Sequence, residues 1–216
     1  MRRLVTNTFV TLDGVMQAPG GPEEDPSGGF TLGGWSFNYW DDTMGGVMDD
    51  FMGKPFDLLL GRKTYEIFAA HWPHAEGEEA GPLNAAHKYV ASRTLERAGW
   101  KPSTLIRDVP REVADLKNGD GPEIQVHGSA DLIQTLLEHE LIDEMHVWTF
   151  PLVVGPGKRL FADGTIPRNL RVSGTTISST GVVMATYEFA GAIRTGSFAL
   201  DTPTEAEVLR REKLES

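Results

Sequence analysis

The sequence predicts an α/β protein whose central sheet is mixed, mostly parallel, with an antiparallel hairpin at its C-terminal end. Through about residue 150, short strand-like runs alternate with helix-like segments, an order that is typical of parallel βαβ units. Two β-rich segments, residues 170–178 and 182–189, then follow each other across Ser179-Thr180-Gly181. A short polar turn between two such segments indicates an antiparallel hairpin.

Strands are expected where β-branched, aromatic or apolar residues gather between turn residues, at residues 3–11, 56–60, 88–91, 104–106, 123–127 and 144–150. The last of these alternates, so His146, Trp148 and Phe150 fall on one side. Helices are expected where apolar residues recur at helical spacing, at residues 40–52, 63–68, 110–118 and 130–139.

Two Gly- and Pro-rich stretches, residues 12–37 and 72–86, are predicted to be loops. The first is long for a compact domain, and long loops are often functional. Because it contains Phe30, Trp35 and Phe37, we expect it to pack against the rest of the protein.

The chain of 216 residues is long enough for one well-filled core. We expect one domain over residues 1–190 and a charged extension over 191–216, helical or partly disordered.

The formal net charge of -11 repels phosphate backbones, so nucleic acid and anionic membranes are not expected partners. The absence of cysteine excludes disulfides and thiolate chemistry. No signal peptide or membrane span is recognisable, and we expect a cytoplasmic protein.

Three predicted strands end in small, hydroxyl-bearing or basic residues, in the segments 61–64 (GRKT), 92–94 (SRT) and 128–130 (GSA). The carboxyl ends of parallel strands lie along one edge of a sheet, where ligands bind. Two of these segments also open helices, whose N-termini attract phosphate. Each segment alone also fits an ordinary turn, but the coincidence of three at one edge favours a phosphate site.

The residue types in these segments suit a dinucleotide. The two glycines, Gly61 and Gly128, allow a phosphate to approach the backbone, and Thr64 and Ser129 supply hydroxyl donors. Two arginines, at positions 62 and 93, offer forked, permanently charged donors. The extra 2′-phosphate of NADPH needs more positive charge than NADH, so the pair favours NADPH.

Several motifs together resemble a known family: 61–66 (GRKTYE), 90–93 (VASR), 127–132 (HGSADL), 141–144 (LIDE), 151–157 (PLVVGPG) and 11–15 (TLDGV). They resemble the dihydrofolate reductase fold and, more specifically, the reductase domain of the riboflavin-biosynthesis deaminase–reductase with its stand-alone bacterial relatives. The resemblance covers residues 3–190 and implies a three-layer α/β/α fold. It implies an NADPH site formed by Gly61, Arg62, Thr64, Ser92, Arg93, Gly128, Ser129 and Ala130.

The resemblance also implies where the chemistry takes place. Asp13 and Gly14 would lie beside the reacting carbon of the cofactor, with Pro151 and Gly155 nearby. In dihydrofolate reductases a buried carboxylate on the first helix donates the proton, and Asp42 is the candidate at that position, although its spacing requires a gap. An acid that only stabilises the helix N-terminus is the alternative for Asp42.

Asp13 is the other candidate acid, and an Asp before a Gly is also common in turns. Gly14, Trp40 and Tyr65 are expected to contact the substrate. The pair His71 and His74 lacks a third ligand, so no metal is expected.

The expected function is therefore NADPH-dependent reduction of a small heterocycle. The substrate would resemble dihydrofolate or 5-amino-6-(5-phosphoribosylamino)uracil. The fused deaminase's zinc motif requires cysteines, which are absent, so deamination is not expected. The alternative is a non-catalytic NADP-binding or assembly protein on the same fold, because fold alone does not decide function. A homodimer is expected because most soluble oligomers are symmetric dimers.

Overall fold

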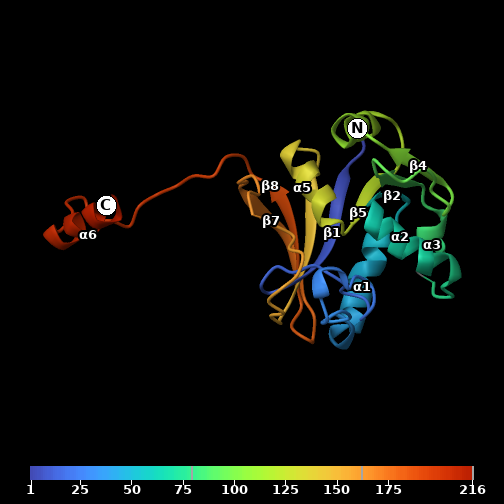
Figure 1. Ribbon diagram of the computed structural model, residues 1–216, viewed down its shortest axis with the longest axis horizontal. Helices are drawn as coiled ribbons and strands as arrows, with labels where there is room; N and C mark the ends of the chain where they lie inside the picture. Colours follow the sequence, from blue (N-terminus) through green and yellow to red (C-terminus); the bar gives the residue numbers. More distant parts are fainter. Residues whose placement is uncertain (79, 162, 216) are drawn as a thin grey trace.

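A computed structural model describes residues 1–78, 80–161 and 163–215 (Figure 1). One eight-stranded sheet has the order β4-β3-β2-β5-β1-β6-β8-β7. The parallel strands are β1 (Leu4–Thr11), β2 (Phe56–Gly61), β3 (Lys88–Ala91), β4 (Ser103–Ile106), β5 (Glu123–His127) and β6 (Glu144–Phe150). The hairpin β7 (Leu170–Ile177) and β8 (Val183–Phe189) is antiparallel and joins the sheet through β6. The predicted mixed sheet is confirmed.

Helices cover both faces of the sheet. On one face, α4 (Val109–Asn118) and α5 (Ala130–Glu138) pack against apolar residues that include Leu59 and Ile124. On the other face, α1 (Asp42–Met52), α2 (Arg62–His71) and α3 (Ala80–Ala85) pack against Leu58, Leu60 and Trp148. Side chains alternate along a strand, and the Leu58-Leu59-Leu60 run is fully buried on both faces. The structure therefore has the predicted three layers.

The prediction of a loop over residues 72–86 is wrong. The structure has a 3-10 turn at Trp72–His74 and then helix α3. Ala80 and Leu83 are buried three residues apart on α3, which places both on the side that faces the sheet. Pro82 lies in the first turn of α3, where a backbone N–H group has no hydrogen-bond partner within the helix. The missing N–H of proline therefore breaks no helical hydrogen bond there.

The loop over residues 12–37 packs on the protein body, as predicted. Phe30 and Trp35 are buried, and the Trp35 Nε1–H donates to the Gln17 carbonyl at 2.8 Å. Lys158 donates to the Asp25 carboxylate across the loop. The expectation that Phe37 packs inward is wrong, because this side chain is 77% exposed. It lies in a 3-10 turn that presents it to solvent.

After β8 the chain leaves the sheet and ends in α6 (Glu205–Glu215), which Figure 1 draws apart from the other elements. Glu207 forms ion pairs with Arg210 at 2.7 Å and Arg211 at 2.8 Å, spacings that stabilise an isolated helix. In the described residues, none of the helices has the length and apolar character needed to cross a bilayer.

A buried lysine opens β3. Lys88 is fully buried, its Nζ donates to the Asn84 carbonyl at 2.6 Å, and the ammonium lies 4.2 Å from the Trp100 ring centroid. Burial lowers the pKa of Lys88 to about 8. The unfolded chain therefore binds more protons than the folded protein between that pH and the ordinary value of 10.5.

We predict that the free energy of unfolding rises with pH across this window, by up to about 1.4 kcal/mol per pH unit from this group. The Lys88→Met variant keeps the apolar stem and lacks the titration, so its rise should be smaller. Urea unfolding of both proteins at the two ends of the window measures the difference. An identical pH dependence in the two proteins would contradict the assignment.

Candidate functional site

The carboxyl ends of the neighbouring strands β2 and β5 meet at a close contact. The Gly61 N–H donates to Ser129 Oγ at 3.0 Å, and Thr64 Oγ1 lies 2.6 Å from the same oxygen. A Cβ atom added at position 61 would lie 2.7 Å from Ser129 Oγ. Only glycine therefore fits at position 61 without displacing the serine. We call Gly61, Thr64, Gly128 and Ser129 the Ser129 corner.

Two consecutive left-handed residues shape this corner. Gly128 has a φ of 75° and Ser129 a φ of 76°. The left-handed region costs a non-glycine residue roughly 1 kcal/mol, and such local strain persists where the surrounding structure fixes it. The turn directs the Ser129 side chain back toward Gly61.

The N-termini of four helices near the sheet edge fall into two kinds. α1 and α4 begin after Asp41 and Asp108, whose carboxylates each accept a backbone N–H from the first turn. α2 and α5 begin after Gly61 and Ser129, and neither residue makes a side-chain cap. α2 and α5 lie on opposite faces of the sheet, and their N-termini converge at the Ser129 corner. Unpaired N–H groups and the positive ends of two helix dipoles make this corner suited to an anion.

The two predicted arginines differ in their contacts. Arg62 donates to Glu66 at 2.7 Å and to Thr94 Oγ1 at 2.7 Å, so it connects α2 with the loop after β3. Ser92 Oγ accepts the Leu95 N–H at 3.0 Å and forms the turn in that loop. Arg93 is exposed, and within the described residues it makes no hydrogen bond or ion pair. Arg93 is therefore a cation available to a ligand beside this loop.

Asp13 is held at the other end of the predicted site, after β1. Its carboxylate accepts the Thr11 hydroxyl at 2.5 Å and the Gly155 N–H at 2.9 Å. The hydrogen bond from Thr11, with further bonds from the backbone of residues 154–155, lowers the pKa of Asp13 below its ordinary value. The ionised form is favoured, which weighs against Asp13 as a proton donor near neutral pH. Its contacts fit a residue that positions the loop at 154–155.

The other predicted residues of this region lie around Asp13. Gly14 and Gly155 have φ values of 82° and 79°, so both turns use the left-handed region. Arg159 donates to the Gly155 carbonyl at 2.9 Å and lies 3.7 Å from the Asp13 carboxylate. Pro151 directly follows β6 and is exposed.

The underside of α1 carries no carboxylate. Four apolar side chains of α1 face the sheet. Met44, Val47 and Met48 belong to the apolar cluster that contains Trp148, and the Phe51 ring contacts the His146 ring. Asp42 lies in the first turn of α1 and is exposed. The buried helix carboxylate that the resemblance implies is therefore not found at Asp42, because the stripe that faces the sheet is apolar.

The two aromatic residues expected to contact substrate lie in different surroundings. Trp40 is 47% exposed and stacks on Trp148, with ring centroids 6.1 Å apart. Tyr65 is 4% exposed, and its hydroxyl accepts the Trp100 N–H at 2.8 Å. α2 directs Tyr65 into the core with its polar atom already engaged, so only Trp40 lies where a flat ring could stack.

Polar side chains that the sequence reasoning did not single out form a row beneath α1. Asn7 on β1 pairs in register with His127 on β5 and His146 on β6. The Phe51 ring lies 5.7 Å from the His127 ring and 4.8 Å from the His146 ring. Burial lowers the pKa of His127 to about 4, so it is neutral at pH 7. The alternating pattern of residues 144–150 is the sequence signal that could have drawn attention to His146.

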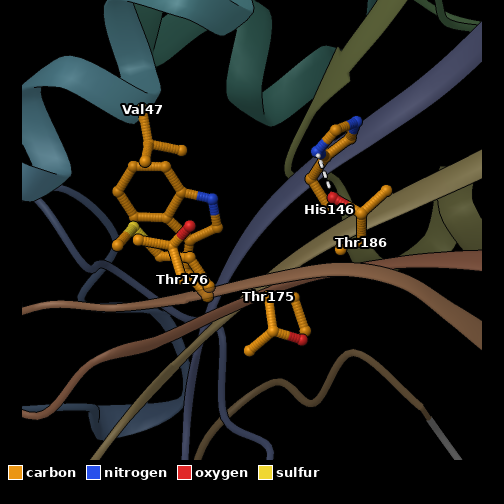
Figure 2. A pocket seen from close by; sticks show the side chains of 9 residues that line it. Val47, His146, Thr175, Thr176 and Thr186 are labelled. Atoms are coloured by element: carbon orange, nitrogen blue, oxygen red, sulfur yellow. Dashed lines mark hydrogen bonds between the residues drawn. The ribbon is translucent and has the colours of Figure 1, made fainter.

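A cavity of about 130 Å³ lies between α1 and strands β6, β7 and β8 (Figure 2). Val47 of α1 lies over it, and His146 and Thr186 face each other at its side. His146 Nε2 lies 2.8 Å from Glu144 Oε1, and its Nδ1 lies 3.2 Å from Thr186 Oγ1. Across the described ranges, no group of three or more His, Asp or Glu side chains could hold a metal ion.

Residues 2–184 match the family of the RibD C-terminal domain. The chain belongs to this family. The match spans strands β1 to β7, the first two residues of β8, all helices except α6, and every predicted site residue.

Two Bacillus subtilis (strain 168) proteins are similar in sequence. The uncharacterized protein YyaP is 29% identical over 199 residues, which covers 88% of this chain and 96% of YyaP. The uncharacterized protein YwjB is 29% identical over 127 residues, covering 58% of this chain and 70% of YwjB.

Solved structures share the fold. A Shewanella sp. PV-4 protein named for riboflavin biosynthesis superposes with a TM-score of 0.62 at 20% identity, covering 88% of this chain and 100% of that one. A pyrimidine reductase-like protein from Corynebacterium diphtheriae has a TM-score of 0.60 at 10% identity, with 88% and 93% covered. Dihydrofolate reductase from Enterococcus faecalis, complexed with NADP(H) and RAB-propyl, has a TM-score of 0.56 at 14% identity, with 88% and 97% covered.

The contact at the Ser129 corner makes a prediction about stability. Gly61→Ala should destabilise the protein by roughly 1–3 kcal/mol, the usual cost of overpacking, because its Cβ meets the Ser129 side chain. Ser129→Gly removes those atoms. Adding Gly61→Ala to the Ser129→Gly protein should therefore lower the free energy of unfolding by less than about 1 kcal/mol. Urea unfolding of the two single variants and the double variant measures the coupling. Additive costs would show that the clash is not the cause.

Proposed function

We propose that this protein is an NADPH-dependent reductase of a small heterocyclic substrate, working as a cytoplasmic homodimer. The observation that carries the proposal is the convergence of two uncapped helix N-termini at the Ser129 corner. Membership of the RibD C-terminal domain family supports it. The net charge of -11 makes such a local site necessary, because the surface as a whole repels an anionic cofactor.

The residues at this corner fit the phosphates of a dinucleotide. The missing side chains at Gly61 and Gly128 let an oxygen approach the backbone, and Thr64 and Ser129 place two hydroxyls together. Ala130 opens α5, where its N–H lies at the positive end of the helix. These residues would hold the diphosphate.

The extra phosphate of NADPH would lie by the loop after β3. Arg93 supplies the free guanidinium there, and Ser92 shapes the turn that presents it. Arg62 already bonds Glu66 and Thr94, so its contribution is to hold α2 and this loop in register. A forked, permanently charged side chain suits a phosphate monoester.

NADPH, when bound, supplies a hydride. The protein's own contribution is orientation and exclusion of water. Asp13 ties the turn after β1 to Gly155, which fixes the rim where Gly14 and Pro151 would border the ring of the cofactor. Trp40 offers a partly exposed aromatic face for a flat substrate.

The substrate class follows by analogy. One structural neighbour is named as pyrimidine reductase-like and another is a dihydrofolate reductase. We infer a substrate that resembles dihydrofolate or 5-amino-6-(5-phosphoribosylamino)uracil.

A second candidate is a non-catalytic NADP-binding or assembly protein on the same fold. One observation favours it: the underside of α1 carries no carboxylate to donate a proton. The two candidates share the cofactor site and differ in the substrate pocket.

The experiment measures NADPH binding by calorimetry and then NADPH oxidation with dihydrofolate and aminopyrimidine substrates. Binding with turnover supports the reductase. Binding without turnover on the whole panel favours the second candidate. Failure to bind NADPH at millimolar concentration would overturn both.

Removing the Arg93 guanidinium should weaken the binding of NADPH more than the binding of NADH. We predict that Arg93→Ala weakens NADPH binding about tenfold, the equivalent of about 1.4 kcal/mol, while NADH binding changes less than about twofold. Arg97→Ala is the matched control, since it removes the same charge from another exposed position nearby. Equal losses for NADPH and NADH, or an equal effect of Arg97→Ala, would contradict the role of Arg93.

A further inference from the structure

The carboxyl end of β4 brings another arginine to the loop that follows β3, residues 92–95. β3 and β4 are parallel neighbours in the sheet, and the Ser92 N–H donates to the Ile106 carbonyl at 3.0 Å. Arg107, the next residue after β4, therefore lies beside this loop. The sequence reasoning did not single out Arg107, because it is one exposed arginine after a short strand.

Arg107 holds the loop through two backbone carbonyls. Its Nη1 donates to the Ser92 carbonyl, and its Nη2 donates to the Leu95 carbonyl at 2.6 Å. One planar guanidinium therefore spans the loop from its first residue to its last. The Glu112 carboxylate accepts the backbone N–H of Arg107 at 2.8 Å, which fixes the base of the arginine side chain.

The loop is held from two neighbouring strands, and Arg93 is the side chain that it presents. β2 and β4 flank β3 in the sheet. Arg62, which follows β2, donates to Thr94 Oγ1 at 2.7 Å, and Arg107, which follows β4, holds the two carbonyls. Arg62 also pairs with Glu66. In the described part of the chain no carboxylate forms an ion pair with the Arg107 guanidinium, so a test of its role must separate its charge from its geometry.

We propose that Arg107 is a positioning residue for the 2′-phosphate of the cofactor. It fixes the backbone on both sides of Arg93, so the ligand does not have to order the loop when it binds, and ordering a loop weakens binding. The inference rests on the proposed function and adds to it the end of β4, the outermost strand of the sheet. The ligand group is a phosphate monoester on the ribose, beyond the diphosphate at the Ser129 corner.

The test uses two probes that differ only in this phosphate, adenosine 2′,5′-bisphosphate and 5′-AMP, titrated by calorimetry. The wild-type protein should prefer the bisphosphate by about tenfold. Arg107→Ala should reduce that preference by about fivefold, because the ligand must then order the loop. Arg107→Lys keeps the charge but replaces the fork with a point charge, so it should restore the preference only in part.

Arg111→Ala is the matched control. It removes the same charge from the first turn of α4, where Arg111 lies 3.9 Å from Asp108, and it should leave the preference unchanged. A loss in Arg111→Ala equal to the loss in Arg107→Ala would show a general effect of charge and would overturn the proposal.

A double-variant cycle separates positioning from direct contact. Because Arg107 acts through Arg93, adding Arg107→Ala to the Arg93→Ala protein should reduce the remaining preference by less than about twofold. Independent losses, or full restoration by Arg107→Lys, would show that the charge of Arg107 acts directly and would overturn the proposal. Equal losses for the two probes in Arg107→Ala would indicate a purely structural role and would also overturn it.

Parallel measurements separate this inference from the proposed function. Urea unfolding checks that each variant is folded. If Arg107→Ala is not folded, Arg107→Lys decides alone: a partial loss of the preference supports the proposal and no loss overturns it. Failure of the wild-type protein to bind NADPH at millimolar concentration would overturn the proposed function, while the ratio of the two adenosine probes would still decide the role of Arg107.

Discussion

The approach of the Ser129 side chain to Gly61 is the constraint around which the site is arranged. β2 and β5 lie side by side in the sheet, and the helices that follow them cover opposite faces. The absence of a side chain at position 61 lets Ser129 reach the Gly61 N–H. As a result the N-termini of α2 and α5 open at one point on the sheet edge. Neither helix has a side-chain cap there, so their unpaired N–H groups are available to an anion.

The Ser129 corner and the region under α1 differ in character. The proposed phosphate site is the Ser129 corner with the neighbouring loop that presents Arg93, where helix dipoles and a guanidinium supply positive charge within an acidic protein. Under α1 the helix is apolar and the sheet carries the polar groups. Placing His146 and Thr186 on strands fixes their hydrogen bonds through the strand register, a more rigid support than a loop gives.

The mixed, mostly parallel sheet and the meeting of the GRKT and GSA segments at one edge could be predicted from the sequence because both follow from local patterns. Apolar runs followed by GRKT and GSA indicate strand, turn and helix within a few residues. The short α3 was missed, because its six residues contain Gly and Pro and only tertiary burial of Ala80 and Leu83 stabilises it. The surroundings of Tyr65 and the bonds of Asp13 were also beyond prediction, since the Trp100 and Gly155 partners lie far away along the chain. The chain Glu144–His146–Thr186 joins two strands whose register no local pattern fixes.

Amide chemical shifts test the central claim most directly. In a titration of ¹⁵N-labelled protein with NADPH, we predict the largest shifts at the first-turn amides of α2 and α5 and at Gly61 and Gly128, which precede these helices. The capped first turns of α1 and α4 serve as internal controls and should shift little. Shifts that leave α2 and α5 unchanged, or that cluster at the capped helices, would contradict the claim that two uncapped N-termini form the cofactor site.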